Sequence, residues 1–230
     1  MNDYDVIVIG GGGAGMSAAI QAADAGVRVA LLEAGERVGG STALAGGYLF
    51  ASGTPQQRER GIEESSDAMV DHILNLNGDS IAKDLAIRIA EQAPSALSWL
   101  GEIGVDYPAQ MLSSADGRMT ARSHGPIGQG AKIAERLDVE LSKRDIDLAC
   151  DTRVDRLAFD DSGAVCGVYI GDQLISSATV VIACGGVGGD LDMEWAVTST
   201  WFVRCCQRRK EWVIRCGMWV VRQTVVMACV

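Results

Sequence analysis

The chain has 230 residues, a formal net charge of −10 at pH 7 and seven cysteines. This length allows one good hydrophobic core or two small domains, and the acidic balance argues against nucleic acid as a partner. No stretch is long and apolar enough for a membrane helix, and the cysteines show no metal-ligand spacing, which predicts reduced thiols and no metal site. Because the acidic N-terminus runs straight into a strand and is unlike a signal peptide, we expect a cytoplasmic protein.

The N-terminal segment predicts a strand–helix–strand unit. Val6–Ile9 is rich in β-branched residues, as a buried strand is. An alanine-rich helix from about Ala14 to Ala25 follows, and Val27–Leu32 forms a second strand that ends at Glu33. This order of elements is that of a dinucleotide-binding βαβ unit.

The turn after the first strand contains Gly10-x-Gly12-x-x-Gly15. Gly10 lets the chain turn off the strand, Gly12 lets a pyrophosphate approach the backbone, and Gly15 lets the helix pack close to the sheet. The helix N-terminus would face the phosphates, and the Glu33 carboxylate would accept hydrogen bonds from a ribose diol. An ordinary glycine-rich turn is the alternative, but the agreement of strand, spacing and acid favours a dinucleotide site.

The segment after Glu33 indicates which dinucleotide binds. It contains Gly39-Gly40-Ser41-Thr42 and then Ala45-Gly46-Gly47, and Glu33 would repel the 2′-phosphate of NADP. On these residues the chain resembles the FAD-dependent flavoproteins of the fumarate reductase, succinate dehydrogenase and 3-ketosteroid Δ1-dehydrogenase family. The resemblance implies an α/β fold: a Rossmann-like FAD-binding domain of the glutathione reductase type, with an antiparallel β-meander and inserted helices. An NAD-binding Rossmann dehydrogenase is the less favoured alternative.

The resemblance also implies which residues bind FAD. Residues 40–42 would run along the pyrophosphate and flavin, and residues 45–47 would pass close to the isoalloxazine ring, where only small residues fit. Val154 would contact the adenine end through its backbone, and the strand leading into Gly185 would cover the cofactor. The full predicted set is Gly10, Gly12, Ala14, Gly15, Glu33, Ala34, Gly40, Ser41, Thr42, Ala45, Gly46, Gly47, Val154 and Gly185.

Some members of that family attach FAD covalently to a histidine in this segment. Neither His72 nor His124 lies between residues 30 and 50, so we expect noncovalent FAD. Arg122 could clamp a substrate carboxylate, and Tyr107 or His124 could move a proton. The favoured interpretation is that all three are loop residues whose side chains bond to backbone or water. The catalytic residue therefore stays unknown.

Helical periodicity predicts three helices in an insertion of about residues 62–104. They are Ser66 to about Asn77, a helix that opens at Asp79 or Ser80, and Pro94 to Gly104. In the second helix, Ile81, Leu85 and Ile89 form the expected core-facing stripe. A further helix spans about Gln129–Lys143.

Short segments joined by tight turns follow and predict an antiparallel meander, before the chain returns to a buried strand. The predicted strands are Asp147–Cys150, Arg153–Phe159, Ala164–Ile170, Gln173–Ser176 and, as the buried one, Thr179–Cys184.

We expect residues 1–190 to form the FAD-binding domain and residues 191–230 to be an atypical tail. Residues 195–230 hold four of the five tryptophans and carry a net charge of +5, whereas residues 1–194 carry −15, an abrupt change of composition. One hypothesis is a shifted reading frame, so that the capping and substrate domain of the family is absent. A cationic membrane anchor is the less favoured hypothesis, because the arginines do not gather on one helical face.

The resemblance implies an FAD-dependent oxidoreductase that transfers hydride between flavin N5 and a C–C or C=C bond next to a carbonyl or carboxylate. Its partners would be a small-molecule substrate, either a dicarboxylate or a steroid-like enone, and an electron donor or acceptor. The alternative is a non-catalytic, truncated FAD-binding fragment.

Overall fold

The computed structural model describes residues 2–77, 81–114 and 119–186, which fall into two compact units. The first unit comprises the described parts of residues 1–41 and 137–230, and the second comprises those of residues 42–136. The second unit contains the predicted insertion of about residues 62–104 and extends beyond it on both sides. The predicted tail, residues 191–230, lies outside the described residues.

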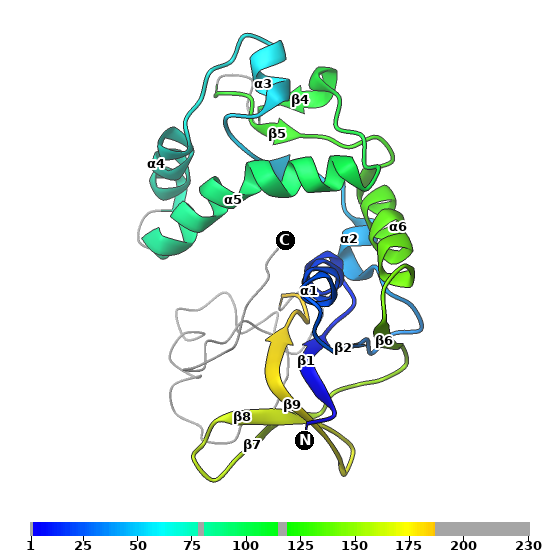
Figure 1. Ribbon diagram of the computed structural model, residues 1–230. Coiled ribbons are helices and arrows are strands. Elements are labelled where there is room, and N and C mark those ends of the chain that lie inside the picture. The colour runs from blue at the N-terminus through cyan, green and yellow to red at the C-terminus, as the bar shows by residue number, and fades with distance from the viewer. Residues whose placement is uncertain (1, 78–80, 115–118, 187–230) are drawn as a thin grey trace, which may run out of the picture. The chain divides into compact units, whose positions relative to one another are not determined.

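The first unit is built on a six-stranded sheet in the order β6-β2-β1-β9-β8-β7 (Figure 1). Four strands pair in parallel: β6 (Ile146–Ala149), β2 (Val29–Leu32), β1 (Tyr4–Ile9) and β9 (Gln173–Ile182). Two more continue the sheet antiparallel to β9: β8 (Val165–Ile170) and β7 (Arg156–Phe159). The predicted α/β class and the predicted meander are both confirmed.

Two strands differ most from their sequence predictions. The strand predicted at Arg153–Phe159 begins at Arg156. The sequence predicts separate strands at Gln173–Ser176 and Thr179–Cys184, but both belong to the single strand β9. The first part of β9 pairs antiparallel with β8, and its later part pairs parallel with β1. Because β9 pairs first with β8 and then with β1 without leaving the sheet, no turn separates its two parts.

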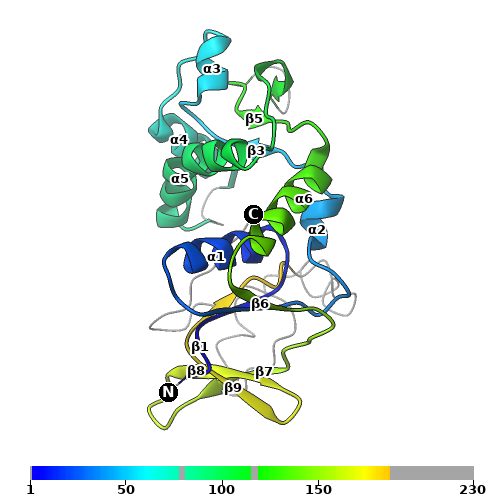
Figure 2. The same ribbon diagram turned by 45° about the vertical axis from the view of Figure 1, so that its right-hand side comes forward.

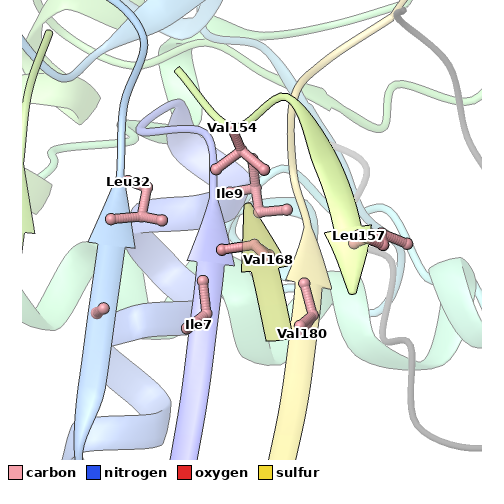
Figure 3. Close-up of a cluster of buried hydrophobic side chains, with 8 residues drawn as sticks. Ile7, Ile9, Leu32, Val154, Leu157, Val168 and Val180 are labelled. Carbon is pink, nitrogen blue, oxygen red and sulfur yellow. The ribbon is translucent and has the colours of Figure 1, made fainter. Parts of the chain in front are cut away.

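Apolar side chains hold the parallel strands to the helix on one side and to the meander on the other. The helix α1 (Gly13–Asp24) packs against β1, β2 and β9 through buried residues that include Met16 and Ile20 (Figures 1 and 2). The cluster toward the meander takes alternate residues of each strand, as the pleat requires. Its buried members are Ile7, Ile9, Ala30, Leu32, Val154, Leu157, Val168 and Val180 (Figure 3).

In the second unit, α4 (Ser66–Asn77) packs against α5 (Lys83–Glu102) (Figure 2). Their shared core contains Met69 and Val70 from α4 and two alanines from α5. The hydroxyl of Ser65 accepts the Ala68 N–H at 3.2 Å and caps α4, one residue earlier than the sequence predicts.

The helix α5 corrects two sequence predictions. It continues through Pro94 instead of starting there, and its capping residue is Ala82, whereas Asp79 and Ser80 lie outside the described residues. Its buried positions are Ala86, Ala90, Ala93, Leu97 and Leu100. The predicted stripe is wrong at Leu85 and Ile89, which are each 39% exposed, whereas Ile81 packs against the core shared with α4. Proline removes one helical hydrogen bond, and the stripe of buried positions on both sides of it outweighs that loss.

A three-stranded antiparallel sheet completes the second unit in the order β3 (Leu49–Phe50), β5 (Ser123–His124), β4 (Leu112–Ser113). The short helices α3 (Pro55–Glu59) and η2 (Ala109–Met111) pack against one another. The helices α2 (Gly40–Leu44) and α6 (Gln129–Ser142) run across the two boundaries between the units. Within the described residues, no helix combines the length and the apolar content needed to cross a membrane.

Candidate cofactor site

The turn between β1 and α1 uses two glycines because the chain comes close to itself. Gly10 has a φ of +103°, and a Cβ there would lie 2.5 Å from the Ala183 carbonyl oxygen at the end of β9. A Cβ on Gly15 would overlap the Gly10 carbonyl oxygen. The predicted reasons for both glycines, a sharp turn and a close helix, are present in the geometry.

Gly12 is different, because nothing in the described protein requires a glycine there. A Cβ on Gly12 would meet no atom within 4 Å, and its φ of −74° and ψ of −178° suit any residue. Gly12 also caps α1 without any side-chain hydrogen bond, so the positive end of the helix dipole lies next to this open space. The open space beside a helix N-terminus fits a pyrophosphate.

We expect Gly15→Ala to lower the free energy of unfolding by about 1–3 kcal/mol, because the new methyl group must displace the Gly10 backbone. Urea unfolding measures the change. Gly12→Ala is the matched control three residues earlier, where a methyl group finds open space. Equal stability of the two variants would contradict the close packing of α1 on the turn.

Glu33 is held in place at the end of β2 by two backbone groups. One carboxylate oxygen accepts the Gly11 N–H at 2.6 Å, and the other accepts the Gly35 N–H at 2.7 Å. Each oxygen keeps further acceptor capacity, which is what a ribose diol would need. Gly11 is a site residue that the sequence reasoning missed, and its signal was the uninterrupted run of glycines from 10 to 13.

A pocket of about 180 Å³ opens beside Glu33, at the carboxyl ends of the parallel strands, where open α/β sheets bind ligands. Its lining residues are Ile9, Gly10, Leu32, Glu33, Ala34, Thr152, Arg153, Val154 and Cys184. Gly10, Glu33, Ala34 and Val154 were predicted to lie at the site. Thr152 and Arg153 were missed, because the pairing of β6 with the distant strand β2 brings them there, whereas Cys184 follows the strand that was expected to cover the cofactor.

The next glycine-rich step lies beside the turn. The Gly39 N–H donates to the Gly11 carbonyl oxygen at 2.8 Å, and a Cβ on Gly40 would lie 3.4 Å from the Gly12 Cα. Gly40 and the exposed Ser41 are thus held near Gly12, as expected of residues that run along a pyrophosphate. Two other predicted residues also belong to this unit: Ala14 is half-buried in the first turn of α1, and Gly185 is exposed after β9.

The predicted residues Thr42, Ala45, Gly46 and Gly47 belong to the second unit. Three of them, Thr42, Ala45 and Gly47, lie against Gly130 at the start of α6. The Gly130 N–H donates to the Ala45 carbonyl oxygen at 3.0 Å. Gly47 has a φ of +74°, and a Cβ there would lie 2.7 Å from the Gly130 nitrogen. Packing inside the protein therefore requires glycine at position 47 even without a ligand. Contact of this segment with a flavin stays a prediction.

Arg122 is engaged inside the second unit. Its guanidinium forms an ion pair with Glu64, and the two side chains are only 6% and 3% exposed. The Gln57 amide also donates to Glu64, at 2.8 Å, and to the Ala121 carbonyl oxygen at 2.9 Å. Because its charge is matched by Glu64, Arg122 has a structural role here and not that of a substrate clamp.

His124 belongs to the same buried network. Its Nδ1 lies 2.9 Å from the Arg122 carbonyl oxygen and 3.2 Å from that of Leu49, so Nδ1 carries the proton. Nε2 then accepts from the Thr54 hydroxyl at 2.8 Å, while that hydroxyl accepts the Gln57 N–H at 3.2 Å. Burial lowers the pKa of His124, and the neutral ring satisfies every partner.

Stability should therefore depend on pH through His124. Its pKa is lower in the folded protein than the ordinary value of 6.5, so the unfolded chain binds this proton more readily. The free energy of unfolding is then highest above pH 6.5 and falls as the pH drops below it, by at most about 1.4 kcal/mol per pH unit. Urea unfolding across this range should show the slope in wild type and in His72→Gln, and His124→Gln should lack it. The same slope in His124→Gln would contradict the assignment.

Tyr107 is also buried, and its burial raises the pKa of the phenol. Its hydroxyl has no hydrogen-bond partner among the described residues, as is also true of Ser52 Oγ and Gln56 Oε1. The phenol stays protonated across the physiological pH range, which disfavours Tyr107 as a general base.

A glycine-rich βαβ turn, an acid at the end of β2 and a pocket at the carboxyl ends of parallel strands define a dinucleotide-binding domain. A family model described as an FAD binding domain matches residues 5–210. The chain therefore belongs to this family of FAD-binding domains, and FAD is its cofactor. Its characterised relatives are FAD-dependent oxidoreductases. The match also overlaps residues 191–210 of the predicted tail.

Two relatives are reductases of unsaturated acids. A fumarate reductase (cytochrome) of Shewanella frigidimarina is 33% identical over 192 residues, which are 79% of this chain and 33% of that protein. A urocanate reductase of Eggerthella lenta is 34% identical over 201 residues, 84% of this chain and 33% of that protein. The chain thus spans about a third of the length of these relatives.

Solved structures agree with both branches of the resemblance. The open conformation of a flavocytochrome c3 fumarate reductase matches with a TM-score of 0.78 and 27% identity, over 86% of this chain and 36% of that one. The 3-ketosteroid-Δ4-(5α)-dehydrogenase of Rhodococcus jostii RHA1, in complex with 4-androstene-3,17-dione, matches with a TM-score of 0.73 and 25% identity, over 85% and 49%. The predicted relationship to both groups is confirmed.

Proposed function

We propose that this chain supplies the FAD-binding part of an oxidoreductase that transfers hydride between flavin N5 and a C–C or C=C bond next to a carboxylate or carbonyl. Bound FAD supplies two-electron chemistry of this kind. The observation that carries the proposal is the open space at Gly12, beside the start of α1, whose N-cap makes no side-chain hydrogen bond, and the pocket at Glu33. The family match supports FAD as the group that occupies this space.

In this proposal the first unit holds the adenosine and pyrophosphate parts of FAD. Gly12 and Ala14 at the start of α1 meet the pyrophosphate, Glu33 binds the ribose, and Ala34 and Val154 lie at the adenine. The other predicted contacts follow toward the flavin: Gly40, Ser41, Thr42, Ala45, Gly46, Gly47 and Gly185. FAD is held without a covalent bond, because His124 is bonded within its own network and His72 lies on α4.

The substrate is proposed only as a class, a dicarboxylate or a steroid-like enone, with an electron donor or acceptor as second partner. One relative is a fumarate reductase, and one structural neighbour was solved in complex with the steroid 4-androstene-3,17-dione. No residue is proposed as the catalytic acid, because Arg122 and His124 are engaged in the buried network. A cytoplasmic location stays a prediction from the sequence.

The test begins with the purified full chain, to which FAD is added and the excess removed. We expect flavin absorbance in the visible range with quenched fluorescence. The flavin is then reduced anaerobically with reduced methyl viologen, and fumarate, urocanate and 4-androstene-3,17-dione are offered separately. Reoxidation by one class of acceptor supports the reductase and names its substrate class. FAD binding without any reoxidation favours the alternative of a non-catalytic FAD-binding chain, and a colourless protein contradicts the proposal.

A further inference from the structure

The backbone on both sides of Arg153 is fixed at the mouth of the pocket. Asp151, with a φ of +51°, turns the chain after β6, and its N–H donates to the Gly35 carbonyl oxygen at 2.9 Å. The Thr152 N–H donates to the Glu33 carbonyl oxygen at 2.8 Å. Val154 is buried in the core cluster. Arg153 therefore projects from a short segment that is anchored at both ends, opposite the end of β2.

The Arg153 side chain is exposed and lines this pocket, yet no hydrogen bond or ion pair within the described part of the chain engages its guanidinium. Among the other described arginines of the first unit, Arg37 is likewise unpaired but does not line the pocket, and three have partners. Arg28 pairs with Asp5, Arg144 with Asp24 and Glu140, and Arg156 lies 4.0 Å from the centre of the Tyr169 ring. A cation without a partner, in a chain of net charge −10, has its binding capacity free for a ligand.

The pocket places Arg153 toward one end of a dinucleotide. The lining includes Ile9, Leu32 and Val154, which are apolar, together with the Glu33 carboxylate suited to a ribose. Gly12, where the pyrophosphate is expected, is not among the lining residues. The group that meets Arg153 is therefore a flat, uncharged base in preference to a phosphate.

We propose that the Arg153 guanidinium stacks on the adenine ring of FAD and is a cofactor-binding residue of this chain. The guanidinium is planar and weakly hydrated, and it is attracted to the face of an aromatic ring. The inference rests on the proposed function, because it requires FAD to bind in this pocket. Its consequence is that affinity for FAD depends on the shape of the side chain at position 153 as well as on its charge.

The test compares the FAD dissociation constants of the full-length wild type, Arg153→Gln and Arg153→Lys, from quenching of flavin fluorescence at low and high salt. We expect both variants to bind FAD about 3- to 30-fold more weakly, with a ratio to wild type that changes little with salt. Arg156→Gln is the matched control, since it removes the same charge three residues away from the pocket. It should bind FAD as wild type does.

Three results would overturn the inference. Wild-type affinity in Arg153→Lys, with a salt-dependent loss in Arg153→Gln, would mean an ion pair with phosphate in place of stacking. Unchanged affinity in both variants would mean that Arg153 does not contact FAD, while the proposed FAD site would stand. A wild-type chain that binds no FAD would overturn the proposed function together with the inference.

Discussion

Gly12→Ala is expected to weaken FAD binding about 10- to 100-fold while leaving the protein as stable as wild type. Within the described protein the new methyl group meets nothing within 4 Å, and the extended backbone suits alanine. The lower preference for alanine at an N-cap and the reduced freedom of the unfolded chain oppose one another, so the free energy of unfolding should stay within about 1 kcal/mol of wild type. The same methyl group occupies space that the pyrophosphate needs, and such overpacking costs about 1–3 kcal/mol. Fluorescence titration and urea unfolding measure the two quantities.

Gly101→Ala on α5 is the control for this variant. A Cβ on Gly101 also meets no atom within 4 Å, but Gly101 belongs to the second unit and to no predicted cofactor contact. It should keep the wild-type affinity for FAD. Equal affinity of Gly12→Ala and wild type would contradict the assignment of the open space at Gly12 to the pyrophosphate.

Removing the charge of Glu64 is expected to have the largest effect on stability. Glu64→Leu leaves the buried Arg122 guanidinium without its counter-charge, and the loss of one partner of a buried ion pair costs about 3–5 kcal/mol. The double variant Glu64→Leu/Arg122→Leu removes both charges and should be more stable than Glu64→Leu alone. Urea unfolding at neutral pH of wild type, Glu64→Leu, Arg122→Leu and the double variant gives the four free energies that the comparison needs.

The exposed pair of Lys132 and Glu135 is the control for this experiment. Their side chains are 36% and 57% exposed, so Glu135→Leu should leave the free energy of unfolding close to that of wild type. A double variant that loses as much stability as the sum of both single variants would show that Arg122 and Glu64 act independently, against the buried pair described here.

Local parts of the fold could be predicted from the sequence. The elements from β1 to β2 have short connections, and Gly15 acts against Gly10 within the same turn, so pattern and spacing sufficed. The meander was also predictable, because its strands are joined by tight turns. At α5 the pattern failed, since contact with α4 chose the alanine stripe, and neither periodicity nor Pro94 carries that information.

At the pocket too, sequence patterns do not reveal contacts between distant segments. Glu33 and Gly10 could be predicted because they flank one βαβ unit. Thr152 and Arg153 reach the pocket only because β6 pairs with β2, more than a hundred residues earlier in the chain. The Arg122–Glu64 pair likewise joins residues 58 positions apart, and no spacing rule connects an arginine and a glutamate at that distance.

The most direct test of the central claim is a titration of the full chain with FAD, followed by quenching of flavin fluorescence, in wild type and in Gly12→Ala. Our account predicts saturable binding of one FAD per wild-type chain and displacement of FAD by ADP. It predicts that Gly12→Ala unfolds at about the wild-type urea concentration but binds FAD 10- to 100-fold more weakly, which corresponds to about the overpacking cost given above. Absence of saturable binding to wild type, or equal affinity in the variant, would contradict it.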